Sequence, residues 1–325
     1  MSPRTRVFLV VSSLAAGVAI ATIGGTLLLS RGQSASGTEP VALRAGRPPL
    51  VLDLGVRTDR EATVLRRAAV LYRRGRQREA RTDFERYDSV EAQVGAALAR
   101  WPQGSLAALE GLARAHPRSG LVRLHLGLVL LWSRRDTDAL AQWRVVGRVD
   151  PDSPAAIEAE NLLHPSYFRG RPVFVPGFPA PAALGRLSPA QELAFLARRA
   201  RGRDPHAKLL YGVALQRLGR PVSAEREFRA AATLSPHDPE ARVAAAVGLF
   251  DKSQPARAFS RLGPLVNVFP HAATVRFHLG LLLLWLGRVD EAKRQLRLAR
   301  ADAPRSTLGL EANRFLKRLE GIGTK

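Results

Sequence analysis

The fold is decided by residues 205–236, PHAKLLYGVALQRLGRPVSAEREFRAAATLSP, and by two further copies of their pattern. The stretch ends on Pro236, and the copies end on Pro270 and Pro304, each 34 residues after the last. Small and large residues precede these prolines at fixed distances: Gly212, Ala246 and Gly280; Leu215, Leu249 and Leu283; Ala224, Ala258 and Ala292; Phe228, Leu262 and Leu296. A fixed period of this length, with small and large residues in register, indicates a helical-hairpin repeat.

The residue types fit two antiparallel helices packed against each other in every repeat. The small residue of the first helix lies where that helix approaches the second, and the alanine of the second helix lies opposite it. Large residues fill the remaining space. Proline follows the second helix because it cannot continue a helix. The period therefore predicts helices throughout residues 205–304.

The best copy of the pattern is Tyr211-Gly212-x2-Leu215, Gly219, Ala224-x3-Phe228, Pro236. It resembles the tetratricopeptide repeat, but Lys208, Arg242 and Arg276 stand where the family has tryptophan early in the first helix. The resemblance implies an all-α fold, a right-handed superhelical solenoid of tetratricopeptide-like hairpins in two blocks. It also implies that the first helix of each hairpin lines the concave side. It leaves activity open, because such repeats are platforms for many functions.

Two blocks carry the pattern, over residues 61–164 and 187–325. The first block has a clear unit at its start, a degenerate unit over 89–117 and a clear third unit that ends on Pro151. Residues 122–132, VRLHLGLVLLW, and 275–285, VRFHLGLLLLW, are identical at nine of 11 positions. We infer that an ancestral block of several repeats was duplicated. An amphipathic helix over about 306–320 is expected to close the array with a polar outer face.

An uncharged apolar run occupies residues 7–29. At about 1.5 Å per residue it is long enough for a transmembrane helix. Arg4 and Arg6 before it favour an anchor, within residues 1–30, that places the repeats on the extracytoplasmic side of the cell membrane. The alternative is a signal peptide cleaved after Ala19-Ile20-Ala21, which would leave an apolar new terminus. We therefore expect a single-pass membrane protein.

Two segments interrupt the helical pattern. Residues 31–60 are expected to be a linker, flexible over 31–49 where Gly, Ser and Pro are frequent. Its last part, LVLDLGV (50–56), fits either a short strand or an apolar flap over the first hairpin. The second segment, 165–186, contains PSYFRGRPVFVPGFPAP (165–181), whose prolines exclude a regular helix and whose aromatic residues are too apolar for a free linker. A helix is expected to resume with a capping box from Ser188 to Gln191.

The composition gives little support to nucleic-acid binding or to catalysis. The chain has 50 Lys and Arg against 28 Asp and Glu, but the arginines are scattered through the repeats, which favours solvated helix faces and disfavours nucleic acid as a partner. The absence of cysteine excludes disulfides and thiol chemistry. No His pair has metal-binding spacing, and no phosphate loop or nucleophile elbow occurs. We expect no metal, no cofactor and no catalytic residue, so the protein is not expected to be an enzyme.

The resemblance implies which positions of the duplicated helices face the groove, and these are the candidate partner-binding residues: Leu124, Leu128, Leu131, Trp132, Phe277, Leu281, Leu284 and Trp285. Both helices are apolar nearly all round, so something must cover each face. The cover is either the chain itself, with the insert 165–181 folded into a groove, or an apolar segment of a partner protein. Self-packing is favoured for at least one groove.

These observations favour a membrane-anchored scaffold or assembly factor that binds segments of partner proteins. In this respect the chain is similar to bacterial envelope proteins with one N-terminal anchor and a tetratricopeptide array. Family members that grip a C-terminal carboxylate place Asn where this chain has Val213, Val247 and Leu281, so no carboxylate clamp is expected. The alternatives are a regulatory subunit of an enzyme complex and, less favoured, a basic helical-repeat protein that binds nucleic acid.

Overall fold

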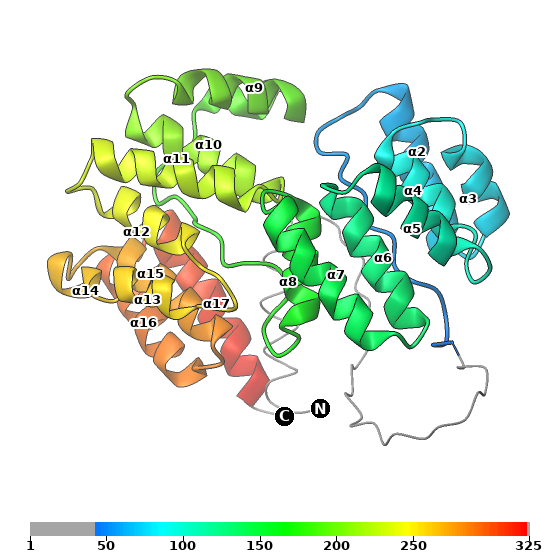
Figure 1. Ribbon diagram of the computed structural model, residues 1–325. Helices are drawn as coiled ribbons and strands as arrows, with labels where there is room; N and C mark the ends of the chain where they lie inside the picture. Colours follow the sequence, from blue (N-terminus) through cyan, green and yellow to red (C-terminus); the bar gives the residue numbers. More distant parts are fainter. Residues whose placement is uncertain (1–42, 324–325) are drawn as a thin grey trace. The chain divides into compact units, whose positions relative to one another are not determined.

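The computed structural model describes residues 43–323, and within this range the secondary structure is helical, with no strand (Figure 1). The described helices form two compact units, one ending at Pro165 and one beginning at Ser166. We call them the N-terminal and the C-terminal unit. The predicted anchor over 7–29 and the alternative cleavage site both lie outside the described residues. Inside them, no helix combines the length and apolar character that crossing a membrane requires.

The N-terminal unit consists of three antiparallel hairpins and one closing helix. Its elements are α2 (Arg60–Arg73), α3 (Gln77–Phe84), α4 (Val90–Leu98), α5 (Ser105–Ala115), α6 (Gly120–Trp132), α7 (Asp136–Val149) and α8 (Pro154–Leu163). Helix α2 pairs with α3, α4 with α5 and α6 with α7, and α8 packs on the last pair. The degenerate second repeat is therefore a true hairpin, as the sequence predicted.

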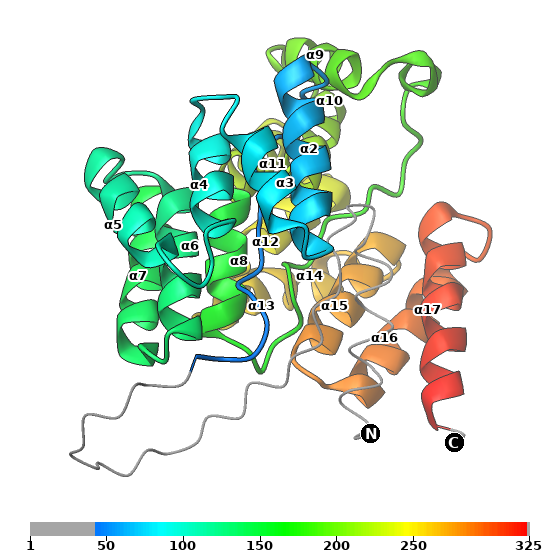
Figure 2. The same cartoon turned by 90° about the vertical axis from the view of Figure 1, so that its right-hand side faces the viewer.

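The C-terminal unit has the same plan with additions at its start. Its elements are η1 (Ala182–Arg186), α9 (Pro189–Ala200), α10 (Pro205–Arg217), α11 (Pro221–Leu234), α12 (Pro239–Gly248), α13 (Ala256–Leu262), α14 (Leu265–Val268), α15 (Ala273–Trp285), α16 (Val289–Asp302) and α17 (Thr307–Gly323). Figure 2 shows α15, α16 and α17 side by side at the end of the unit. The period of 34 residues thus predicted the helical hairpins correctly.

The last three helices of the two units correspond in detail. Arg123 of α6 donates from Nη1 to Gln142 Oε1 of α7 over 3.1 Å. Arg276 of α15 makes the equivalent bond to Gln295 of α16 over 3.3 Å. Both pairs are related by the same offset of 153 residues as the repeated helix sequence. The inferred duplication therefore extends from sequence to individual side-chain contacts.

Helix starts follow the local chemistry that the sequence carries. At α9, the Ser188 hydroxyl accepts from the N–H of Gln191, and the Gln191 side chain accepts from the N–H of Ser188. This is the predicted capping box. Asp204 and Asp238 cap α10 and α12, and each is followed by a proline at the first helical position. Such caps satisfy N–H groups that have no partner inside the helix.

Glycine allows the two helices of a hairpin to approach closely, as the repeat pattern predicted. A Cβ added to Gly212 of α10 would lie 2.3 Å from the Phe228 ring of α11. One added to Gly127 of α6 would lie 2.3 Å from Nε1 of Trp143, which donates to the Leu124 carbonyl. The large residue of the second helix therefore occupies the space that a side chain on the first helix would need.

One expectation about the linker is wrong in part. The sequence suggested that residues 31–49 are flexible, but from Arg44 onward the chain is bonded to the N-terminal unit. The N–H of Arg44 donates to the Trp132 carbonyl over 2.9 Å, and Pro48 is buried. Gly, Ser and Pro content indicates a preference for non-helical backbone. It does not show whether that backbone is free or docked.

Candidate functional site

An extended segment of the C-terminal unit lies across the inner helices α10, α12 and α15, and we call residues 168–178 the second arm. Three consecutive inner helices each present a side chain that accepts a backbone N–H of this arm. Phe174 N–H donates to Gln216 Oε1 over 3.1 Å, Val175 N–H to His278 Nε2 over 2.9 Å, and Gly177 N–H to Glu240 Oε2 over 3.2 Å. The aromatic insert therefore fills the groove of its own unit, which was one of the two alternatives left open by the sequence.

Aromatic side chains fix the second arm in this groove. Phe174 is 1 % exposed, stacks on His278 at a centroid distance of 5.1 Å and meets Phe228 edge to face at 5.6 Å. Phe168 meets Trp285 edge to face at 5.7 Å. Aromatic contacts of this kind contribute free energy beyond the burial of their area. The arm is thus held by both backbone hydrogen bonds and buried rings.

A second extended segment, residues 44–54, covers the inner helices of the N-terminal unit, and we call it the first arm. The Val51 N–H donates to His125 Nε2 over 3.0 Å. The Tyr72 hydroxyl donates to the Pro48 carbonyl over 2.7 Å, and the Trp101 indole donates to the Gly46 carbonyl over 3.1 Å. The sequence left residues 50–56 as a strand or a flap. The structure shows an extended cover without strand pairing.

The two duplicated histidines bind the two arms in the same way. In each, Nδ1–H donates to the carbonyl four residues earlier, Leu121 for His125 and Thr274 for His278, over 2.7 Å in both cases. This bond leaves Nε2 unprotonated and able to accept the valine N–H. Burial lowers the pKa of both His125 and His278 to about 4, so both rings are neutral at pH 7. From the sequence, these histidines had shown only that they lack metal-binding spacing.

The two arms also share a sequence. Residues 46–54 are GRPPLVLDL and residues 170–178 are GRPVFVPGF, so Gly, Arg, Pro and Val recur at identical positions. Apolar residues also occupy the fifth and ninth positions of both segments. When the two valines that bind His125 and His278 are aligned, the whole motif comes into register. We write it Gly-Arg-Pro-x-Φ-Val-x-x-Φ, where Φ is apolar.

This motif is the signal that repeat analysis of the helices misses. The arms are related by an offset of 124 residues, whereas the last hairpins are related by 153. Helix α9 and η1 lie between the second arm and the hairpins, and the N-terminal unit has no counterpart to them. A search for short identical segments at any offset finds Gly-Arg-Pro at 46–48, 170–172 and 219–221, and only the first two copies continue with a large apolar residue at the fifth position and valine at the sixth. The acceptors Gln216 and Glu240 carry no comparable sequence signal.

The predicted groove residues lie beneath the arms or in the cores next to them. Leu124, Leu128, Leu131, Phe277, Leu281, Leu284 and Trp285 are all buried, with exposed fractions of 8 % or less. Trp132 is half-buried, and its indole nitrogen has no hydrogen-bond partner within the described residues. The chain itself therefore covers the two apolar helices, α6 and α15. Binding of a partner at these residues stays a prediction.

One carboxyl group at the second arm has unusual electrostatics. Glu240 of α12 is half-buried beside Gly177, and burial raises its pKa to about 7. The Gly177 N–H and the Thr274 side chain oppose this rise because they bond to the carboxylate. The groove therefore contains one acid that is partly protonated at neutral pH and one imidazole that is not protonated.

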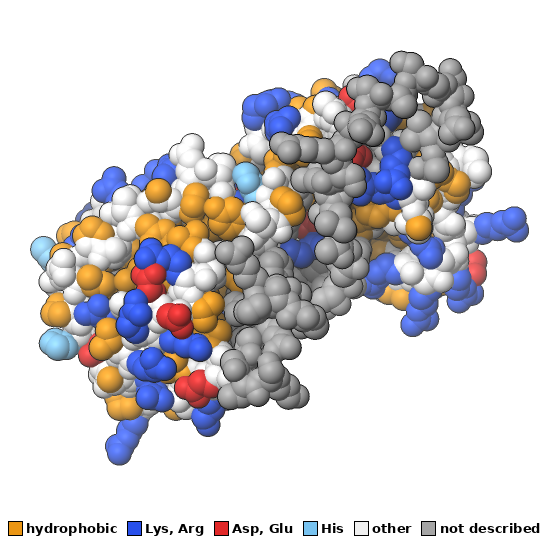
Figure 3. Space-filling view, turned by 90° about the horizontal axis from the view of Figure 1, so that it is seen from below, with side chains coloured by type: hydrophobic (Ala, Val, Ile, Leu, Met, Phe, Trp, Pro, Cys, Tyr) orange, Lys and Arg blue, Asp and Glu red, His pale blue; other side chains and the backbone are white. Residues whose placement is uncertain are grey.

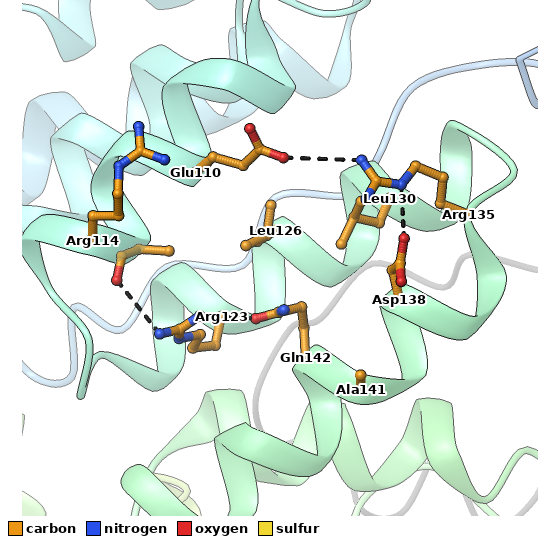
Figure 4. Close-up of a pocket in the computed structure, with 10 residues that line it drawn as sticks. Glu110, Arg114, Arg123, Leu126, Leu130, Arg135, Asp138, Ala141 and Gln142 are labelled. Carbon is orange, nitrogen blue, oxygen red and sulfur yellow. Dashed lines mark hydrogen bonds and ion pairs between the residues drawn. The ribbon is translucent and has the colours of Figure 1, made fainter.

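A separate cavity of about 310 Å³ lies on the outer side of the N-terminal unit, between α5, α6 and α7 (Figure 4). Arg135 pairs with Glu110 at 3.9 Å and with Asp138 at 2.8 Å. Arg123 donates to the neutral acceptors Gln142 Oε1 and the Ala113 carbonyl, while its buried Nε has no hydrogen-bond partner within the described residues. Arg114 adds a third cation to the lining. We assign no ligand to this cavity, because none of these contacts identifies one.

The described residues, 43–323, contain no candidate metal centre. No cluster of three or more His, Asp or Glu side chains within this range has the arrangement of a metal site. On the face seen in Figure 3, Lys and Arg side chains are spread among apolar and acidic ones. The two arm-covered grooves are therefore the candidate functional site.

Comparisons with known proteins assign the chain to no family. No protein-family model matches it, and no curated protein is significantly similar. A tetratricopeptide repeat protein from Parabacteroides merdae is 11 % identical, with a TM-score of 0.34 over 80 % of this chain and 98 % of its own. YrrB, a protein of the same repeat class with an unusual peptide-binding site, is 16 % identical, with a TM-score of 0.32 over 64 % and 99 %. Yeast Tom70 is 12 % identical, with a TM-score of 0.31 over 81 % and 67 %. TM-scores this low do not establish a structural relationship. The fold is therefore defined by the helix pairs given above.

Proposed function

We propose that the protein is a scaffold that binds extended segments of partner proteins in its two grooves, where its own arms now lie. The supporting observation is that each groove already binds an extended polypeptide through backbone N–H groups and apolar side chains. Both kinds of contact transfer readily to another segment, because every residue except proline offers the same N–H. The arms then act as internal occupants that a partner must displace.

Competition with an arm sets a requirement on the partner. A covalently attached segment has an effective concentration on the order of millimolar or higher. A partner segment of equal intrinsic affinity therefore needs a comparable local concentration, or it must bind more tightly. Attachment to a membrane through residues 7–29, on its extracytoplasmic side, would supply such local concentration for partners in the same membrane. The proposal thus includes three further statements. Residues 7–29 anchor the protein in a membrane, the repeats lie on the extracytoplasmic side, and the protein itself catalyses no reaction.

Site-specific photo-crosslinking in intact membranes tests the function. A photoreactive phenylalanine replaces Trp285 in one variant and Trp132 in another, so that an aromatic residue replaces an aromatic residue in each groove. We expect two kinds of product at each position, one to the protein's own arm and one to a segment of another protein. The same probe at Leu298, which is 43 % exposed on α16, is the control for non-specific capture.

The crosslinking has a clear contrary outcome. If both groove positions yield only the protein's own arm, or if the Leu298 probe yields the same foreign proteins at the same level as the groove probes, the grooves are internal cores. Partner binding through them would then be wrong. Circular dichroism of each variant shows whether the helical content is preserved, so that a misfolded variant is not mistaken for a negative result.

A further inference from the structure

We propose that each groove reads a specific sequence, and that the partner segment carries the pattern Gly-Arg-Pro-x-Φ-Val-x-x-Φ in extended form. This inference rests on the proposed function, since it names the chemistry of the segment that would bind. It is argued from two copies of one motif, whose valines bind equivalent histidines on α6 and α15. Four features of the motif are recognised by contacts in the structure.

The glycine is required by backbone conformation. Gly46 has φ of +83° and Gly170 has φ of +87°, a left-handed conformation in both arms. Residues with a Cβ adopt this conformation at an energetic cost, whereas glycine adopts it freely. A Cβ on Gly46 would meet no atom within 4 Å, so space is not the reason. The groove therefore selects glycine because the chain must bend there before it enters.

The arginine binds at the carbonyl end of an inner helix in both units. Arg47 donates from Nη1 to the Tyr72 carbonyl over 3.0 Å, and its guanidinium lies 5.8 Å from the centre of the Tyr72 ring. Arg171 donates from Nη1 to the Phe250 carbonyl, just beyond α12, over 3.1 Å. Carbonyl groups at a helix C-terminus carry partial negative charge and lack partners in the helix, so they favour a cation.

The proline and the apolar side chains of the motif are recognised because the groove buries them, fully or in part. Pro48 and Pro172 are both buried, and proline also restricts the backbone to the extended conformation that the arm adopts. The last apolar position is Leu54, buried at 6 % exposure, in the first arm and Phe178, stacked on His206, in the second. By contrast Val173, at the variable fourth position, is 37 % exposed. The proline is thus buried in both arms, whereas the fourth position is exposed in the second arm.

The valine is placed by the imidazole that accepts its N–H, His125 in one groove and His278 in the other. A neutral imidazole with its Nδ1–H already bonded can only accept at Nε2. A proline at this position would lose the donor and leave the buried imidazole nitrogen without a partner, which carries a desolvation penalty. The groove therefore excludes proline at the sixth position while it requires proline at the third.

Binding of a synthetic peptide to the full chain tests this reading. The peptide is residues 168–178, FRGRPVFVPGF, with a fluorescent label at its N-terminus, and binding is measured by anisotropy. The receiving chain carries Phe174→Ala, which loosens its own second arm by removing the ring between Phe228 and His278. We expect tighter binding than to the unmodified chain. The variant Val173→Ala changes the exposed position of the same arm and should behave as the unmodified chain.

Changes in the peptide, which cannot unfold the protein, test each position. Peptides with Gly170→Ala, Arg171→Glu or Val175→Pro should each bind at least about tenfold more weakly, because each removes one recognised feature. If all three bind as well as the original, the groove reads only apolar character and the inference is wrong. A second receiving chain, Arg171→Ala, leaves the apolar residues of the arm in place and repeats the test should Phe174→Ala fail to fold.

The outcome separates this inference from the proposed function. If crosslinking captures a partner segment that lacks the motif and that the peptide does not displace from the groove, the scaffold function is supported. The inference that the groove recognises the motif is then wrong. If the peptide series behaves as expected but crosslinking captures no foreign segment, the reading stands for the arms alone and the partner is disproved. Both proposals are supported only when the captured segment carries the motif and the peptide displaces it.

Discussion

Two buried histidines make the same hydrogen bond in the two units, and this predicts how stability depends on pH. The pKa of His125 and of His278 falls from 6.5 to about 4 on folding. Between these values the unfolded chain binds more protons than the folded one, so stability falls as the pH falls from about 6.5 to 4. Because each ring is fully buried, the loss amounts to up to about 3 kcal/mol per histidine.

The substitution His278→Gln tests the origin of this loss. The glutamine amide oxygen can accept the Val175 N–H but does not titrate, so the difference in unfolding free energy between pH 7 and pH 4.5 should shrink by about 2–3 kcal/mol in the C-terminal unit. Urea unfolding followed by circular dichroism measures it at both values. His237→Gln, at an exposed histidine before α12, should leave the difference unchanged. An equal effect of both substitutions would contradict the assignment.

The carboxyl group of Glu240 should make the stability depend on pH in the opposite direction. Its pKa rises from 4.5 to about 7 on folding, so its stabilising contribution is complete below pH 4.5 and is lost as the pH rises through 7. Glu240→Gln keeps an acceptor for the Gly177 N–H without a titrating group. We expect it to stabilise the C-terminal unit at pH 8 by about 2 kcal/mol, a value reduced for partial exposure, and to have little effect at pH 5. Glu192→Gln on α9 is the control. If Glu240→Gln raised the unfolding free energy at pH 5 as much as at pH 8, the prediction would be contradicted.

At the scale of elements, the hairpins show which glycines are indispensable. Gly127 of α6 faces Trp143 at a distance that leaves no room for a Cβ, whereas a Cβ on Gly147 of α7 would meet nothing within 4 Å. Gly127→Ala should therefore destabilise the N-terminal unit by about 1–3 kcal/mol through overpacking. Gly147→Ala should stabilise it by about 0.5–1 kcal/mol through helix propensity. Thermal unfolding of the two variants checks the difference in sign, and a shift in the same direction for both would refute it.

The sequence predicted the helices well and the two arms that cover them poorly, for a physical reason. Helix pairs need small residues at close approach and proline after the second helix, so their sequence has a period of 34 residues. An arm has no such period, because its contacts go through backbone N–H and carbonyl groups that every residue shares. Four identities in nine residues are the whole signal, and they lie on Gly, Arg, Pro and Val. The apolar content of the insert 165–181 therefore indicated groove filling as one of two alternatives, whereas residues 44–49 were mistaken for flexible linker.

At the scale of the whole molecule, the two units are versions of one module: an arm, three hairpins and a closing helix. If the arms are equivalent, their sequences should be exchangeable. Replacing residues 170–178 by GRPPLVLGL, which keeps Gly177 because a Cβ there would lie 2.5 Å from Glu240 Oε1, should give a folded C-terminal unit, destabilised by about 1–3 kcal/mol because the contacts of Phe174 and Phe178 are lost. The reversed sequence in the same place should destabilise it much more. Urea unfolding measures both chimeras, and equal stability of the two would show that the motif is not recognised.

Each arm precedes, along the chain, the histidine that holds it. Val51 lies 74 residues before His125, and Val175 lies 103 residues before His278. At a translation rate of about 5–20 residues per second, several seconds pass between the emergence of an arm from the ribosome and that of its imidazole acceptor. During that interval the arm can bond only to the first two hairpins of its unit, through Tyr72 and Trp101 in the N-terminal unit and through Gln216 and Glu240 in the C-terminal unit. The bond to the imidazole can therefore form only later in synthesis than these contacts.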